Sequence, residues 1–249
     1  MGVSATASVL VVAAAALAAS ADARFREAND IARAGDYPAA IAAYAEIAAS
    51  GAETASLYWN WAQAASARGA QGEALWALLR ARELDPADRA VVRDVERLRA
   101  ALNLDPAEIT PEPLAAAARL ARRFRLDLVA VCLLVLSVLT HAAHRLHPAA
   151  HLARLVAWAT LALGFLPGAL AVAGTLARPT GTVVRRGAPL LDSASPTAEA
   201  VGTLREGEVV PILEASGDWV RVEDNAGARG WAHVADVRRL DAPPRAETR

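Results

Sequence analysis

Two long apolar runs separated by a short polar stretch set the tightest limit on how this chain can fold. The runs cover residues 126–143 and 155–177. As a helix, the second run would reach roughly 35 Å, which is longer than the hydrocarbon core of a bilayer, about 30 Å. Neither run has the polar stripe of a surface helix, so each needs an apolar environment on every side. The sequence therefore predicts two transmembrane helices joined by a short loop at 144–154.

The composition excludes several classes of protein. Of the 249 residues, 55% are hydrophobic and only 5% are aromatic, and the 26 basic side chains, all of them arginine, almost balance the 27 acidic ones. A formal charge of −1 argues against nucleic acid as a partner, because its binders need a basic face. Cys132 is the single cysteine, which excludes a disulfide framework and a cysteine-based zinc site.

A third apolar run, residues 9–19, has the length of a signal peptide. The Ala-Asp-Ala sequence at 21–23 fits an A-x-A cleavage pattern. We therefore predict a signal peptide or N-terminal anchor over residues 1–23 and a location in the bacterial inner membrane. The hairpin would then enter and leave the membrane from outside the cytoplasm, so that both water-exposed parts lie on the extracytoplasmic side.

The arginines near the two spans leave this orientation open. Arg145 and Arg154 lie in the predicted loop, as expected of a cytoplasmic loop. Four more precede the first span and would lie outside, against the positive-inside tendency. These are Arg119, Arg122, Arg123 and Arg125. The tendency weakens for long translocated domains, so the extracytoplasmic arrangement is the preferred interpretation.

Between the N-terminal run and the hairpin the sequence repeats with an offset of 34 residues. The segment GDYPAAIAAYAEI at 35–47 aligns with GAQGEALWALLRA at 69–81. This offset is the period of tetratricopeptide repeats, in which small residues lie where two antiparallel helices approach and a proline ends the repeat. We predict two such repeats with a capping helix over residues 24–102, followed by a linker at 103–125.

Tetratricopeptide repeats bind an extended peptide or a helix in the groove lined by the first helix of each pair. The residues predicted to line this groove are Phe25, Arg26, Asn29, Arg33, Trp59, Asn60 and Gln63. Arg26 with Asn60 would hold a partner carboxylate, because Arg presents a planar fork and Asn a further donor. Solvated polar side chains are the alternative interpretation. Trp59 and Trp61 cannot share a helix face, so one is expected in the core and the other in the groove or at the surface.

After residue 179 the sequence changes to short β patterns separated by turn residues. Strands are predicted at 181–186, 200–204, 209–215, 219–223 and 230–234, and strands this short and closely spaced are typical of a small β-barrel. Residues 205–234 resemble the bacterial SH3-like domain. The positions of its glycine, valine and tryptophan motifs are occupied by Gly207, Val210, Trp219, Val222, Gly230 and Trp231.

The resemblance covers residues 180–240 and leaves a disordered tail at 241–249. It implies binding of cell-wall peptides or protein segments, usually outside the cytoplasm. Trp219 and Trp231 are therefore candidates for a ligand face. The alternative is that both belong to the barrel's own core, because a domain this small needs large side chains to close it.

The sequence contains no recognisable catalytic constellation. A chain without lysine cannot form a G-x-x-x-x-G-K-[ST] phosphate loop, and G-x-S-x-G and H-E-x-x-H are absent as well. The histidines near the loop lack an acidic residue to orient them. They are His141, His144, His147 and His151. We predict no catalytic residue, no metal site and no cofactor, and a metal-dependent enzyme is the least favoured alternative.

The order of signal, repeats, hairpin and SH3-like tail resembles the BatE family of Bacteroides aerotolerance proteins. In residues 56–88, Trp61 and Ala62 replace the family's Leu-Gly, and the matching positions are Asn60, Gly69, Gly72, Ala74, Ala81, Leu84 and Pro86. The resemblance implies a membrane complex with von Willebrand A-type Bat proteins and a MoxR-type ATPase, linked to oxidative or envelope stress.

The predicted fold class is a multi-domain membrane protein with α-helical repeats, a two-helix transmembrane hairpin and a small all-β barrel. The predicted function is a non-catalytic membrane-anchored adaptor. A sensor of the cell wall, acting through the SH3-like domain, is the alternative.

Overall fold

The computed structural model describes residues 20–104, 121, 124–146, 151–175 and 178–242. The chain forms two compact units. The first combines Met1–Ile109 with Pro179–Arg249, and the second is Thr110–Arg178. The first unit is therefore built from two chain segments that the apolar hairpin separates in sequence.

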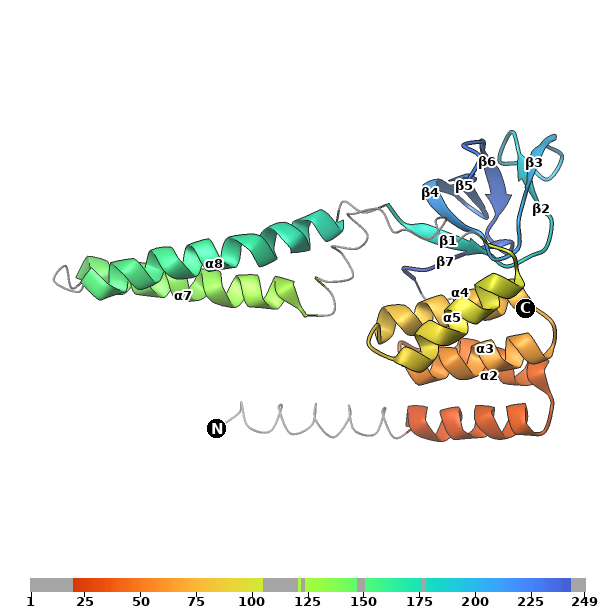
Figure 1. The fold of residues 1–249 in the computed structure, drawn as a ribbon, viewed down its shortest axis with the longest axis horizontal. Coiled ribbons are helices and arrows are strands. Elements are labelled where there is room, and N and C mark those ends of the chain that lie inside the picture. The colour runs from red at the N-terminus through yellow and green to blue at the C-terminus, as the bar shows by residue number, and fades with distance from the viewer. Residues whose placement is uncertain (1–19, 105–120, 122–123, 147–150, 176–177, 243–249) are drawn as a thin grey trace. The chain divides into compact units, whose positions relative to one another are not determined.

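The N-terminal segment of the first unit is helical (Figure 1). Its helices cover residues 20–33, then α2 (Tyr37–Ala49), α3 (Ala55–Ala67), α4 (Gln71–Leu84) and α5 (Arg89–Ala101). The start of α4 follows that of α2 by 34 residues, and the start of α5 follows that of α3 by the same interval. The turn glycines Gly35 and Gly69 repeat at this interval too, with φ of 88° and 83°, a conformation that glycine adopts without strain.

Small residues line the contacts between these helices, and aromatic residues fill the centre. The aligned pairs Ala28/Ala62 and Ala40/Ala74 are at most 1% exposed. The rings of Tyr58, Trp61 and Trp76 pack together with centroids 5.0–5.9 Å apart. Trp61 is 1% exposed and Trp59 is 36% exposed, so the two tryptophans divide between core and surface as predicted.

The C-terminal segment forms an antiparallel sheet that fits an SH3-like barrel (Figure 1). Its strands are β1 (Thr180–Val183), β2 (Ala188–Leu191), β3 (Ala200–Leu204), β4 (Val209–Ser216), β5 (Trp219–Glu223), β6 (Arg229–His233) and β7 (Val237–Arg239). They are hydrogen-bonded in the order β3-β2-β6-β5-β4-β1-β7. Aliphatic side chains form the core, including Val183, Leu190, Leu204, Val210, Ile212, Val220, Val222 and Val237.

Strands β2 and β7 are absent from the sequence prediction. β2 contains Pro189 and follows Gly187, which has a φ of 66°, and both residue types indicate a turn when read from sequence. β7 has three residues, two of them arginine, so it carries no alternation that could be recognised. The predicted first strand, 181–186, ends at Val183 because the chain turns before β2.

The helices and the sheet pack against each other within the first unit. Leu240 is buried in the helical core cluster, and Val184 and Val209 pack against that cluster. The approach is close: a Cβ built on Gly207 would lie 2.8 Å from Leu102, and one built on Gly72 would lie 2.8 Å from the carbonyl oxygen of Val183. The sequence pattern predicts separate repeat and barrel modules, whereas in the structure the two form one unit.

Buried hydrogen bonds connect α4 to the end of the barrel. The Glu73 carboxylate, 3% exposed, accepts from Trp61 Nε1 (3.1 Å), from Arg238 (2.6 Å) and from Arg68. Trp76 Nε1 donates to the carbonyl of Arg239 (2.8 Å). The Arg238 guanidinium also lies 5.2 Å from the centroid of the Trp76 ring, a cation–π arrangement.

A second polar network lies beside the first. Arg80, 5% exposed, donates to the carbonyl of Leu240 and to the carboxylate of Glu53. Glu53 also accepts from the hydroxyl of Tyr58. The chain after β7 is thus held by side chains of α4, and the two charges in this network neutralise each other.

The second unit is a helical hairpin. Its helices are α7 (Leu126–Leu146) and α8 (His151–Thr175), both long and apolar enough to cross a membrane. The helices meet at small residues: a Cβ built on Gly164 would lie 3.2 Å from Leu133, and Ser137 Oγ donates to the carbonyl of Ala157 (2.8 Å). Large apolar side chains point outward, among them Leu139 (61% exposed) and Phe165 (77% exposed).

Three predicted segments lie wholly or largely outside the described residues. Most of the signal segment and of the linker are outside them, as is the tail from residue 243. The predicted cleavage pattern at 21–23 belongs to the helical stretch 20–33. The described hairpin helices extend beyond the predicted 126–143 at its C-terminal end and begin before the predicted 155.

Gly72→Ala should destabilise the first unit by about 1–3 kcal/mol, the usual cost of overpacking. The added methyl group would lie 2.8 Å from the backbone oxygens of Val183 and Val184, and this clash outweighs the roughly 1 kcal/mol by which alanine favours a helix. Denaturant unfolding of the detergent-solubilised chain measures the change. Gly202→Ala is the control, since its nearest neighbour would be at 3.7 Å. Equal stabilities of the two variants would contradict the packing described here.

Glu73→Gln should lower stability at neutral pH by about 2 kcal/mol, because it weakens charge-assisted hydrogen bonds in a buried site. Burial raises the pKa of Glu73, but the guanidiniums of Arg238 and Arg68 outweigh this and hold the pKa below its ordinary value. The stabilisation is therefore complete above the unfolded-state pKa, about 4.3, and is lost as pH falls through the folded-state pKa. Unfolding midpoints measured across this range should converge for wild type and variant at low pH.

Glu96→Gln supplies the control for this pH series, because Glu96 is exposed on α5. Its unfolding midpoint should follow that of the wild type at every pH. A Glu73→Gln curve parallel to that of the wild type down to the lowest pH would show that the Glu73 carboxylate contributes nothing to acid sensitivity.

Candidate functional site

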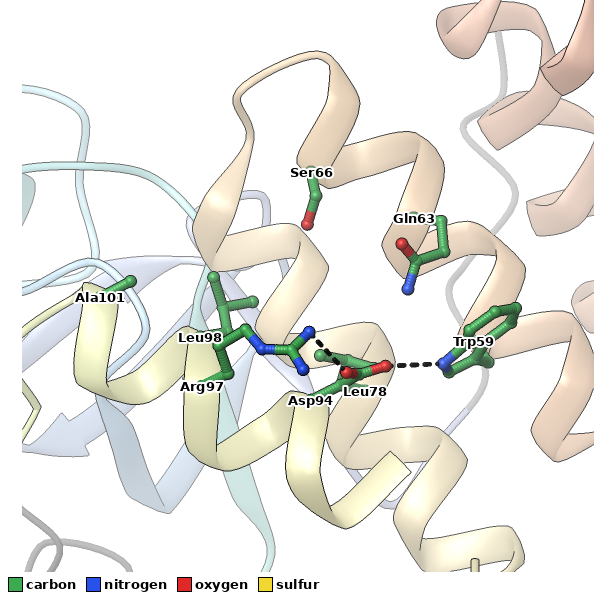
Figure 2. Close-up of a pocket in the computed structure, with 8 residues that line it drawn as sticks. All are labelled: Trp59, Gln63, Ser66, Leu78, Asp94, Arg97, Leu98 and Ala101. Atoms are coloured by element: carbon green, nitrogen blue, oxygen red, sulfur yellow. Dashed lines mark hydrogen bonds and ion pairs between the residues drawn. The ribbon is translucent and has the colours of Figure 1, made fainter. Parts of the chain in front are cut away.

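Two neighbouring hollows lie along the helical segment of the first unit. The α3–α5 hollow, about 390 Å³, is lined by Trp59, Gln63, Ser66, Leu78, Asp94, Arg97, Leu98 and Ala101 (Figure 2). The N-terminal hollow, about 420 Å³, is lined by Asn29, Ala32, Arg33, Tyr37, Tyr44, Asn60, Gln63, Ala64 and Ala67. Gln63 borders both, so the hollows adjoin each other on α3.

The two hollows are equivalent under the 34-residue repeat. Asn29, Tyr44 and Asn60 of the N-terminal hollow correspond to Gln63, Leu78 and Asp94 of the α3–α5 hollow. Both are formed between successive helices that come first in a helix pair. One groove therefore presents two related subsites, and among their differences the neutral amide of Asn60 is replaced by the carboxylate of Asp94.

Most of the predicted groove residues line these hollows. Asn29, Arg33, Asn60 and Gln63 border the N-terminal hollow, and Trp59 and Gln63 border the α3–α5 hollow. The remaining two predicted residues lie elsewhere. Phe25 packs its ring 6.2 Å from that of Tyr44, and Arg26 Nε donates to the carbonyl of Asp22 (3.3 Å).

Of the two residues expected to hold a partner carboxylate together, Asn60 lines the N-terminal hollow and Arg26 is not among its lining residues. Asn60 Nδ2 donates instead to Asn29 Oδ1 (2.9 Å). The reason is helical geometry: Asn29 lies almost one turn further along the helix than Arg26 and so comes level with Asn60 on α3. The side-chain amide of Asn60 is therefore paired with a second amide.

This amide pair has a defined orientation. Asn29 Oδ1 accepts from the Tyr44 hydroxyl (2.8 Å) as well as from Asn60. Burial raises the pKa of Tyr44, against a smaller lowering by Arg33, so the hydroxyl keeps its proton and remains a donor. These two hydrogen bonds use Asn29 Oδ1 and Asn60 Nδ2, which leaves Asn29 Nδ2 as a donor and Asn60 Oδ1 as an acceptor outside them. One donor beside one acceptor matches a peptide group.

The α3–α5 hollow contains a carboxylate in its wall. Asp94 Oδ2 accepts from Trp59 Nε1 (3.0 Å), and Asp94 Oδ1 accepts from Arg97 (3.0 Å) (Figure 2). Asp94 and Arg97 are not among the predicted groove residues, because the sequence pattern predicts a capping helix where α5 lies. The 34-residue offset from Asn60 was the signal that could have identified Asp94.

The predicted tryptophans of the barrel lie on its outer face. Trp219, Arg221 and Glu223 of β5 pair with His233, Trp231 and Arg229 of β6. The alternate residues Val220, Val222 and Ala232 point into the core and are buried. Trp219 and Trp231 are half-buried, and the rings of Trp219 and His233 meet edge to face at 5.3 Å. Of the two interpretations left open by the sequence, the structure favours an outward-facing aromatic pair.

Among the described residues, no group of three or more His, Cys, Asp and Glu side chains lies together as a metal site. His147, one of the four histidines near the loop, is outside those residues. The prediction of no metal and no cofactor therefore stays a prediction.

Comparison with known proteins identifies the barrel. Residues 186–238 match the family described as bacterial SH3 domain, which confirms the predicted SH3-like fold. Neither the curated proteins nor the solved structures contain a match to the chain. The tetratricopeptide assignment and the resemblance to the BatE family remain hypotheses, since the match covers the barrel alone.

Proposed function

We propose that this protein is a non-catalytic, membrane-anchored adaptor whose helical groove binds an extended peptide segment of a partner protein. The observation that carries the proposal is the hydrogen-bonded pair of Asn29 and Asn60 in the wall of a hollow of about 420 Å³, because the amide donor and acceptor that remain suit a peptide group. The repeated helix starts and turn glycines support tetratricopeptide units as the source of this groove.

Membrane anchoring rests on the helical hairpin. Most of the large apolar side chains of α7 and α8 point away from the partner helix, and lipid would remove them from water. The contacts of α4 with β7 bear on the topology. Hydrogen bonds such as that from Arg238 to Glu73 cannot form across a bilayer, and this supports an arrangement in which the two water-exposed segments lie on one side and the hairpin crosses twice.

The preferred side is the extracytoplasmic face of a bacterial inner membrane. The signal-like run at 9–19 and the bacterial SH3 domain support this choice. A place beside von Willebrand A-type Bat proteins and a MoxR-type ATPase, with a role in oxidative or envelope stress, is the most specific form of the hypothesis. It depends on the resemblance of residues 56–88 and on the order of the segments.

A second candidate function, sensing or targeting of the cell wall, is favoured by the outer face of β5 and β6. Trp219 and Trp231 are diagonal neighbours there, with Arg221 paired opposite Trp231. Aromatic rings stack on sugar rings, and arginine binds carboxylates. The interface with α4 involves β1 and β7, which leaves this face of β5 and β6 available.

The groove is tested by selecting peptides from a random display library on the full chain in lipid nanodiscs. Gln63→Trp should weaken the selected peptides at least tenfold, because a bulky side chain at 63 fills both hollows. Ala42→Trp is the matched control, on an exposed position of α2 that lines neither hollow, and it should bind as the wild type does. Failure to select any peptide, or equal loss in both variants, would argue against the groove.

Retention on purified peptidoglycan sacculi separates the two functions. The adaptor predicts no retention of the nanodisc-embedded chain above that of empty nanodiscs. The sensor predicts retention that falls several-fold in Trp219→Ala and Trp231→Ala, while Gln63→Trp is retained like wild type. If the wild-type chain is retained and only the tryptophan variants lose retention, cell-wall sensing and not the adaptor role would be the principal function.

A further inference from the structure

We infer that the α3–α5 hollow is a subsite for a basic side chain, arginine or lysine, of the peptide that the groove binds. The inference rests on the proposed function and specifies its ligand. Its starting point is the equivalence of the two hollows. A peptide that lies along the groove meets the neutral amide of Asn60 in one subsite and the carboxylate of Asp94 in the next.

The lining of the α3–α5 hollow suits a long side chain with a cationic end. Leu78 and Leu98 supply apolar surface for the methylene stem, as arginine and lysine require. The ring of Trp59, 36% exposed, stands beside Asp94 and provides a face for a cation. The amide of Gln63 and the hydroxyl of Ser66 border the same space (Figure 2) and add acceptor oxygens.

The Asp94 carboxylate already forms an ion pair with the guanidinium of Arg97. Its Nη1 lies 3.0 Å from Asp94 Oδ1, while its side chain is 77% exposed and that of Asp94 is 19% exposed. An exposed pair of this kind within one helix is weak, so a partner's cation can displace Arg97 into solvent. Asp94 and Arg97 are the charged residues among those that line the hollow, and displacement of Arg97 leaves the hollow negative.

The position of the hollow relative to the amide pair supports the same division of roles. Gln63 borders both hollows, so a ligand can reach from one to the other without leaving the groove. Asn29 and Asn60 would hold a peptide group of the main chain, and the neighbouring carboxylate would select the side chain. An acidic side chain at this place would face Asp94 and be repelled.

The test begins with the random-library selection on the full chain in nanodiscs. We expect arginine or lysine to be enriched at one position of the selected peptides, and expect this enrichment to vanish when selection is repeated on Asp94→Asn. This variant places at 94 the amide that the equivalent position, Asn60, already has. Its side-chain oxygen can still accept from Trp59, so the helices keep their contact.

Affinities of one selected peptide and of its citrulline analogue then form a double-mutant cycle. Replacing arginine by neutral citrulline should weaken binding to wild type at least tenfold and leave binding to Asp94→Asn unchanged. Arg97→Ala should strengthen binding of the arginine peptide severalfold, because the internal competitor is gone. Selected peptides without a basic preference, or an equal citrulline effect in wild type and Asp94→Asn, would overturn this inference but leave the groove standing. Failure to select any peptide would overturn the proposed function itself.

Discussion

The burial of α4 is the constraint on which the first unit depends. Every residue from Gly72 to Ala81 is buried, so the helix has no solvent face and is covered by α3, α5 and the barrel together. Two of these residues, Glu73 and Arg80, are charged. Glu73 forms an ion pair with Arg238. Arg80 forms an ion pair with Glu53 and donates to the carbonyl of Leu240. Without the barrel, Glu73 would lose Arg238 and Arg80 would lose the carbonyl of Leu240, which leaves buried polar groups underpaired.

This constraint determines how the two candidate binding surfaces are presented. The barrel uses β1 and β7 against α4, and its outer face on β5 and β6 stays available. The groove is formed by the helices that come first in each pair. Helix α3 contributes both to this groove and to the contact between the helices and the barrel: Trp59 lines the groove, and Trp61 donates to Glu73, which also binds Arg238 of the barrel. The groove and the barrel face therefore belong to one unit, and the apolar hairpin lies between its two chain segments in the sequence.

Much of the fold was predictable because its signals are local. The 34-residue offset, the turn glycines and the apolar runs each occupy a short stretch of chain, and the structure places helices where they indicate. The two missed strands lack such signals: β2 begins with Ala-Pro, and β7 is three residues long. β2 pairs with the following strand β3 and with β6, and β7 pairs with β1, so both strands are recognised by their pairing and not by their own sequence.

Residue types and periodicity by themselves determined the helical repeats, the apolar hairpin, the small barrel and five of the residues that line the groove. Only the tertiary structure decided that repeats and barrel form one unit, that Asn60 donates to Asn29, and that Trp219 and Trp231 lie outside the barrel core. The physical reason is the range of the interactions. Helix period and strand alternation are set by residues a few positions apart. The contact of Glu73 with Arg238 joins positions far apart in the chain. A local sequence pattern therefore does not predict which distant residue pairs with a buried charge.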